Sequence, residues 1–251
     1  MGGLFHSLRH PVRCYMVCAT ARSGSNLLTD GLHATRRAGR PKQFFLPKFQ
    51  EAYGEKHGLD PLRDFAGYVR GVVTATATSN SVFGFKVMGW YLPDFLARLA
   101  AVAPAGARGE TRVLSAFFPR LSFVRIIRRN KVRQAVSKAR ALQSGLWKVQ
   151  PGNAAVAEPR FDPELIAQCL EDTRADEAVW DDFIERNGLT AHTVFYEDLC
   201  SSYESTVRGV LHFLKIRSRA DERIEPITVR QSDELSREWE RRFLESQPAA
   251  A

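Results

Sequence analysis

The residues best suited to chemistry in this chain form a Ser/Gly-rich turn that contains one arginine. Residues 22–26 read Arg-Ser-Gly-Ser-Asn, directly after the apolar run 13–20 and before an amphipathic segment that starts near Ser25. A strand, a turn and a helix in this order leave the first amides of the helix without intrahelical partners, so they point at whatever lies at the turn. The turn therefore predicts an anion site, built from these amides, the hydroxyls of Ser23 and Ser25 and the guanidinium of Arg22.

The turn differs from the phosphate-binding loop of nucleotide-hydrolysing enzymes. That loop, GxxxxGK[ST], needs a lysine before its last Ser/Thr, and residues 20–26 contain none. ATP hydrolysis is therefore disfavoured, and a kinase-like phosphoryl transferase would also need a carboxylate for Mg²⁺ that is not evident. On these residues alone, an ordinary capped strand–turn–helix is an equally good interpretation.

A second concentration of positive charge lies in the middle of the chain. The net charge is +8, and residues 111–157 contain ten Lys/Arg and no Asp or Glu. Within that segment, the apolar run 121–127 predicts a second core strand, followed by Arg128, Arg129 and a helix over 131–147. A second strand–turn–helix predicts a second anion site at the carboxyl edge of the same parallel sheet, so the ligand would carry two anionic groups.

The basic segment has two other interpretations. It is also typical of a solvated helix face or of a surface that binds nucleic acid. The alternative function is therefore a non-catalytic basic protein that binds a nucleotide or nucleic acid. Ionic strength would separate the two functions, because nucleic-acid binding weakens steeply as salt increases.

Both motifs resemble those of sulfotransferases that use 3′-phosphoadenosine 5′-phosphosulfate (PAPS), and in particular the bacterial trehalose sulfotransferase family. The first is similar to that family's sulfate-donor loop and first helix, and it reads ARSGSNLLTDGLHATRRAG (21–39). The second is similar to the 3′-phosphate motif and reads RRNKVRQAVSKARALQSGLW (128–147). Weaker similarity at 83–93, at 195–199 and in the C-terminal segment follows the family's order, so the resemblance runs nearly end to end.

The resemblance implies roles for particular side chains. It places Ser137 and either Arg128 or Arg129 on the 3′-phosphate of the donor, and it places Arg230 nearby. Trp147, at the end of the basic helix, is a candidate contact for the adenosine. The residues implied for the 5′-phosphosulfate are Arg22, Ser23, Gly24, Ser25, Asn26 and Leu27.

The implied reaction is in-line transfer of a sulfuryl group from PAPS to a hydroxyl of a carbohydrate or glycolipid-type acceptor. Arg22 and the loop amides would stabilise the charge that develops on the bridging oxygen of the departing bisphosphate. No metal is expected, because the cations in this interpretation are side chains. A phenol or peptide acceptor remains open from the sequence.

The general base is the point at which the chain departs from the family. Sugar sulfotransferases of this type carry a P-x-E-F-F motif whose Glu is the presumed base, whereas residues 41–45 read Pro-Lys-Gln-Phe-Phe. The amide of Gln43 takes no proton at neutral pH, so another residue supplies the base, the acceptor is acidic, or PAPS is bound without turnover. Lys86, at the end of a predicted buried strand, is a further candidate for catalysis.

The predicted architecture is a single α/β domain over 1–251, a P-loop-like three-layer α/β/α fold with a central parallel sheet. Residues 40–80 are predicted to be an acceptor-binding insertion, and 162–186 a long amphipathic helix. The strands of the sheet are predicted near 13–20, 82–88, 121–127 and 191–196.

Length and composition agree with one globular domain. The chain has 251 residues, of which 44% are hydrophobic and 25% charged, and its apolar runs are shorter than a membrane span needs. Its four cysteines lack metal-ligand spacing and fit reduced thiols, so a cytoplasmic location is expected. Dimerisation is an expectation from the resemblance alone.

Overall fold

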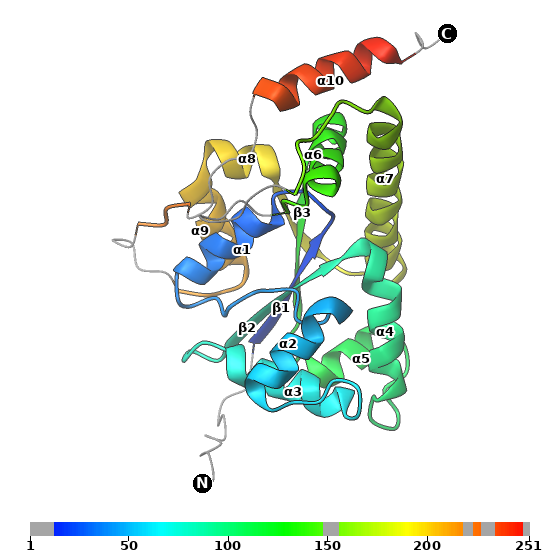
Figure 1. Ribbon diagram of the computed structural model, residues 1–251. Helices are drawn as coiled ribbons and strands as arrows, with labels where there is room; N and C mark the ends of the chain where they lie inside the picture. The colour runs from blue at the N-terminus through cyan, green and yellow to red at the C-terminus, as the bar shows by residue number, and fades with distance from the viewer. Residues whose placement is uncertain (1–12, 148–155, 218–222, 227–233, 248–251) are drawn as a thin grey trace.

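The computed structural model describes residues 13–147, 156–217, 223–226 and 234–247. Its centre is a parallel sheet with the strand order β2-β1-β3-β4 (Figure 1). Each strand agrees with its predicted range to within one residue at either end. The strands are β1 (Arg13–Ala19), β2 (Val82–Met88), β3 (Ser122–Ile127) and β4 (Ala191–Phe195).

Helices cover both faces of this sheet, which confirms the predicted α/β/α architecture. On one side lie α1 (Ser25–Ala34) and α9 (Tyr203–Phe213), and on the other lie α4 (Leu92–Ala101), α5 (Glu110–Phe117) and α7 (Pro163–Arg186) (Figure 1). Because both faces are covered, residues 14–19 of β1 are fully buried, which explains a continuous apolar run instead of an alternating one. The remaining helices are α2 (Pro47–His57), α3 (Phe65–Thr76), α6 (Lys131–Ser144), α8 (Tyr196–Ser201) and α10 (Glu234–Ser246).

The strand order places a ligand-binding edge at the carboxyl ends of β1 and its neighbours. After β1 the chain forms β2 on one side of it, and β3 then joins on the other side. In open parallel sheets, connections that leave a strand in opposite directions open a crevice at that edge, where ligands bind.

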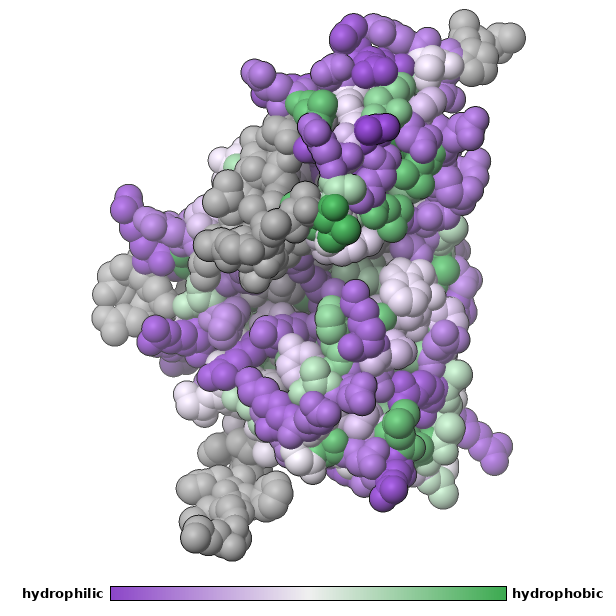
Figure 2. Space-filling view, in the orientation of Figure 1, coloured by the Kyte–Doolittle hydropathy of each residue, from purple (hydrophilic) through white to green (hydrophobic). Residues whose placement is uncertain are grey.

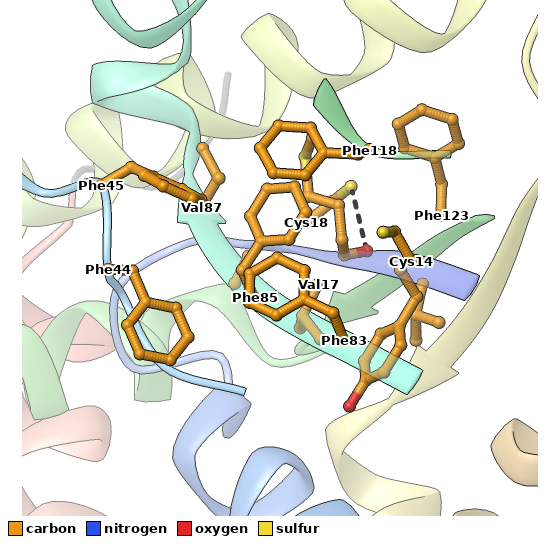
Figure 3. Packing of buried hydrophobic residues seen from close by; sticks show 14 of the residues in the cluster. Cys14, Val17, Cys18, Phe44, Phe45, Phe83, Phe85, Val87, Phe118 and Phe123 are labelled. Carbon is orange, nitrogen blue, oxygen red and sulfur yellow. Dashed lines mark hydrogen bonds between the residues drawn. The ribbon is translucent and has the colours of Figure 1, made fainter. Parts of the chain in front are cut away.

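Aromatic residues fill the core between the sheet and the α4–α5 side. Phe83 and Phe85 of β2 pack against Phe118, with ring centroids 6.1 and 4.5 Å away, and Phe45 packs against Phe85 at 5.3 Å (Figure 3). Side chains alternate along a strand, so Lys86 lies on the face opposite to these rings, toward α1. The alternation along β2 therefore keeps the Lys86 ammonium away from the aromatic side of the sheet.

Residues 40–80 are tied closely to the sheet. The backbone carbonyl of Lys42 accepts a hydrogen bond of 3.0 Å from the Lys86 amide, and Phe44 and Phe45 are buried. Helix α3 adds further buried residues, which are Phe65, Tyr68, Val69, Val72, Val73 and Thr76. This segment therefore supplies part of the core as well as part of the surface.

Two helix ends follow from local chemistry. Helix α6 ends at Ser144, three residues earlier than predicted, because Gly145 adopts the left-handed conformation (φ 70°) that terminates helices. Helix α7 starts where predicted, because the Asp162 side chain accepts a hydrogen bond from the Leu165 amide.

The surface seen from the side of Figure 1 is mostly hydrophilic, with hydrophobic residues in small separate patches (Figure 2). None of the helices in the described ranges is both long and apolar enough to cross a membrane. The four cysteines are free thiols, three of them buried.

Candidate active site

A cavity of about 1180 Å³ lies at the carboxyl edge of the sheet. Every strand contributes to its wall near its carboxyl end: Ala21 follows β1, Met88 ends β2, Arg128 follows β3 and Tyr196 follows β4. The cavity therefore occupies the edge that the strand order predicts for ligand binding.

The predicted anion loop forms one wall of this cavity. Arg22 and Gly24 both adopt positive φ values, 61° and 88°, which turn the chain sharply before α1 begins at Ser25. Gly24 precedes the helix without a side-chain cap, so the first amides of α1 stay open. The ring of Tyr196 packs so closely on Gly24 that an added Cβ would lie 2.3 Å from its Cδ2 atom. Only glycine fits there.

Ser23 lies behind the cavity wall and not in it, unlike the other predicted loop residues. It is fully buried, and both its hydroxyl and its amide donate to the carbonyl of Thr20, at 2.8 and 3.3 Å. The structure therefore uses this serine to hold the turn and does not place it in the cavity wall, whereas Gly24, Ser25, Asn26 and Leu27 line the cavity as predicted.

The two predicted anion sites meet at Arg22. Its Nε atom donates to Ser137 Oγ of α6 at 2.9 Å, and its Nη1 atom donates to the backbone carbonyl of Trp147 at 2.6 Å. Both Ser137 and Trp147 line the cavity, and the Trp147 side chain is 42% exposed. A loop after β1 and a helix after β3 thus form one continuous cationic wall.

Arg128 and Arg129 point in different directions, because consecutive residues at a strand end alternate. Arg128 is buried in the cavity wall, with its guanidinium 4.6 Å from the centre of the Tyr196 ring. Arg129 lies outside the cavity and forms two hydrogen bonds with the carboxylate of Asp198, at 2.7 and 2.9 Å. Of the two arginines that fit the predicted spacing, Arg128 is the one that reaches Arg22: its Nη1 atom donates to the Arg22 carbonyl at 3.4 Å, and it lines the same cavity as Ser137.

The electrostatics of this wall favour an anionic ligand. Burial, with repulsion from Arg128 and Arg140, lowers the pKa of Arg22 to about 10, so the Arg22 guanidinium stays charged at neutral pH. The Nε atom of Arg128 is buried and has no hydrogen-bond partner within the described ranges. Buried cations that repel one another, with a donor left unused, suit a ligand that carries more than one negative charge.

Lys86 lies beneath the first turn of α1. It is only 2% exposed, and its Nζ atom donates to Asn26 Oδ1 at 2.5 Å and to Ser25 Oγ at 3.3 Å. Ser25 and Asn26 both line the cavity, so Lys86 supports the anion loop from below. Gln43 is half-buried and lines the cavity directly.

Another part of the cavity lining is apolar, and it is called the apolar wall below. It includes Phe49 and Trp90, which are 37% and 57% exposed, together with Leu46 and Met88. Within 40–80, a segment that the structure describes completely, only Gln43 and residues 46–49 reach the cavity.

The prediction from sequence missed a pair of carboxylates on α7. Asp172 and Asp176 line the cavity one helical turn apart, and Lys138 Nζ lies 2.8 Å from Asp172 Oδ2. Asp176 is 8% exposed, and burial raises its pKa to about 6. A signal was present, because Asp176 falls on the buried stripe of α7, between Thr173 and Trp180, where a charged residue is unusual.

Arg230, placed near the donor by the resemblance, lies outside the described residues. In the ranges that the structure covers, no group of three or more His, Cys, Asp or Glu side chains is arranged to hold a metal ion.

The sequence is similar to those of known proteins over almost its entire length. Trehalose 2-sulfotransferase of Mycolicibacterium smegmatis is 29% identical, with 93% of this chain and 95% of that protein covered. Trehalose 2-sulfotransferase of Mycobacterium tuberculosis is 30% identical, with 94% and 96% covered. A solved structure, the sulfotransferase domain of the Synechococcus olefin synthase, is 13% identical with a TM-score of 0.48, and covers 97% of this chain and 92% of that one.

The family model described as Stf0 sulphotransferase matches residues 14–246. That range includes the anion loop, all four strands and the basic helix α6. The chain therefore belongs to the Stf0 sulphotransferase family.

Proposed function

We propose that this protein transfers a sulfuryl group from PAPS to a hydroxyl of a carbohydrate acceptor. The observation that carries the proposal is the hydrogen bond between Arg22 and Ser137, which joins the two anion sites in one cavity wall. PAPS differs from ordinary adenylates by a 3′-phosphate, and it needs two such sites. Membership of the family and the similarity to two trehalose 2-sulfotransferases support the reaction and the class of acceptor.

The donor would lie along the cationic wall. The open amides at the start of α1 and Arg22 would bind the phosphosulfate, and Ser137 with Arg128 would bind the 3′-phosphate. The exposed ring of Trp147 is available to the adenosine. The unused Nε atom of Arg128 would gain a partner in this arrangement.

The transfer is an in-line displacement at sulfur. The acceptor oxygen forms a bond to sulfur, the bond to the bridging oxygen breaks, and its electron pair stays on the 5′-phosphate of the departing bisphosphate. Arg22 and the α1 amides would stabilise that charge, while Lys86 would keep Ser25 and Asn26 in place. These groups need no rearrangement during the step, which is the main source of such stabilisation.

The acceptor would occupy the apolar wall, where Phe49 and Trp90 expose ring surface suited to a sugar face. In this arrangement, Gln43 donates and accepts hydrogen bonds with sugar hydroxyls instead of taking a proton. The acceptor-binding part of 40–80 would then be Gln43 and residues 46–49.

The alternative of a nucleic-acid surface fits the cavity less well. Its cations face inward and share the cavity with Asp172 and Asp176, whose charge would repel a phosphate backbone.

Calorimetric titration with adenosine 3′,5′-bisphosphate, with adenosine 5′-monophosphate as the control, tests the donor site. We expect the bisphosphate to bind at least about 100-fold more tightly, because only it engages both anion sites. Sulfate transfer from labelled PAPS to trehalose and other sugars, followed by mass spectrometry, tests the reaction. Equal affinity for the two nucleotides, with no labelled sugar, would exclude the proposed function.

A further inference from the structure

We propose that Asp176 of α7 takes the proton from the acceptor hydroxyl and so serves as the general base that Gln43 cannot be. This inference rests on the sulfuryl transfer proposed above. It is carried by the position of Asp176 at the edge of the sheet, by its burial and by the groups around it.

Asp176 is held at the carboxyl edge between β1 and β2. One turn further along α7, the indole of Trp180 donates a hydrogen bond of 2.9 Å to the carbonyl of Ala19, the last residue of β1. The backbone of Asp176 itself packs against Gly89, which follows β2, so closely that a Cβ on Gly89 would lie 2.3 Å from the Asp176 carbonyl oxygen. These two contacts hold Asp176 close to the carboxyl ends of β1 and β2.

The contact with Gly89 also places Asp176 beside the apolar wall, where the acceptor would bind. Trp90 is the next residue in the chain, and it exposes its ring to the cavity that Asp176 lines. Arg22 and Ser25 line the same cavity from the donor side. A hydroxyl held between the two walls would therefore have the donor sulfur on one side and a carboxylate within the same enclosure.

Among the residues that line the cavity, Asp176 is also the best candidate for the base by its chemistry. The described lining contains no histidine and only two carboxylates, Asp172 and Asp176. Asp172 accepts hydrogen bonds from Lys138 and Gln168, and these lower its pKa, which makes it a weak base. Asp176 accepts no hydrogen bond from any residue that the structure describes, so both oxygens are available to a substrate.

The charges around Asp176 favour a base that works near neutral pH. Its pKa is raised to about 6, mainly by burial. Lys138 of α6 acts to lower this pKa, and Asp172 and Glu177 on the same helix act to raise it. The turn at Gly89 packs against Asp176 through uncharged backbone atoms. The charged Arg22, in the loop after β1, lines the same cavity as Asp176. A carboxylate with a raised pKa accepts a proton more readily than an ordinary one and is still ionised at neutral pH.

The step balances without any further reactant. The acceptor O–H bond breaks, and its proton goes to a carboxylate oxygen of Asp176. The acceptor oxygen bonds to sulfur, and the electron pair of the broken S–O bond leaves with the bisphosphate. Asp176 then releases the proton to solvent, and the product is a sulfate monoester.

The test compares Asp176→Asn with Glu171→Gln, a charge-neutralising control on the same helix at an exposed position outside the cavity. For Asp176→Asn we expect kcat to fall roughly 100- to 10,000-fold, as for loss of a general base. Affinity for the bisphosphate should stay within about two-fold, because the donor site is intact. The acidic limb of the wild-type pH profile should be absent from the residual activity. Glu171→Gln should behave as wild type.

The outcomes separate this inference from the proposed function. If wild type transfers sulfate and Asp176→Asn keeps both its rate and its acidic limb, the assignment of the base is overturned and the sulfotransferase stands. If wild type shows neither transfer nor bisphosphate binding, the function fails, and the base assignment fails with it.

Asp172→Asn decides the case in which Asp176→Asn does not fold. This substitution removes the Asp172 charge, which raises the pKa of Asp176. It also frees Lys138 from its ion pair with Asp172, so the positive charge of Lys138 lowers the pKa of Asp176 more strongly. The acidic limb should therefore move to lower pH. An unmoved limb would contradict the assignment.

Discussion

The Nε atom of Arg22 donates a 2.9 Å hydrogen bond to Ser137 Oγ, although 115 positions separate the two residues. Arg22 belongs to the turn after β1 and Ser137 to the helix after β3. The parallel pairing of β1 with β3 brings both to one sheet edge, so one ligand can contact both motifs.

Replacement of Arg128 and of its neighbour Arg129 should have very different effects. Arg128→Ala removes a buried cation from the cavity wall and should weaken bisphosphate binding roughly 10- to 100-fold. Arg129→Ala is the matched control, because its side chain pairs with Asp198 outside the cavity, and affinity should change less than about three-fold. Calorimetry on both variants measures the difference. Similar losses in the two variants would contradict the placement of the donor.

Ser137→Ala should reduce the preference for a 3′-phosphate. We expect affinity for adenosine 3′,5′-bisphosphate to fall roughly ten-fold, with little change for adenosine 5′-monophosphate, because one hydrogen-bonding group is lost at the second site only. Ser115→Ala on α5 is the control, since its hydroxyl donates only to the carbonyl of Thr111 in the same helix. An equal loss for both nucleotides would place Ser137 elsewhere in the site.

Gly24→Ala should damage the anion loop beyond the cost of its backbone conformation. A positive φ costs an L-residue about 1 to 2 kcal/mol, and the clash with Tyr196 adds a further packing cost of about 1 to 3 kcal/mol. Gly58→Ala has a positive φ but open space around its Cβ, so it should show the conformational cost alone. Chemical denaturation of the two variants measures the difference, and equal destabilisation would exclude the clash.

Asp176→Asn should stabilise the protein at neutral pH while removing activity. Its pKa is raised from 3.8 to about 6 in the folded state, so folding favours the protonated form. The stability that protonated Asp176 contributes to the folded state is fully present below about pH 4, and it is lost as the pH rises through 6. A shift of this size corresponds to at most about 3 kcal/mol, and to about 1 kcal/mol after allowance for the solvent that reaches a cavity-facing carboxyl. Denaturation at pH 7.5 should favour the variant, and at pH 4 the two proteins should be equal.

A carboxylate at the position of Gln43 should replace the one lost at Asp176. Both residues line the same cavity, so Gln43→Glu in the Asp176→Asn background should restore transfer at least about ten-fold over the single variant. The matched control is Gln43→Asn in the same background, which supplies no base. Rescue by both second substitutions would show that size, and not proton transfer, limits the rate.

The local pattern of the chain was sufficient for the strands, for the anion loop and for the basic helix. Apolar runs of strand length and Ser/Gly turn chemistry depend on neighbours in sequence, so β1 to β4 and the loop at 22–26 were predicted from residues alone. The end of α6 was missed because the glycine that terminates it was read as part of the helix.

What the sequence by itself determined was therefore which segments form the sheet edge and which motifs carry the anion-binding chemistry. Only the tertiary structure decided which side chains enter the cavity: Arg128 and not Arg129, Asp176 from α7, and not the buried hydroxyl of Ser23. The reason is physical. Periodicity sets the side of a strand or helix on which a residue lies, but the surroundings of that side depend on packing between segments far apart, such as Trp180 on the carbonyl of Ala19 across 161 positions.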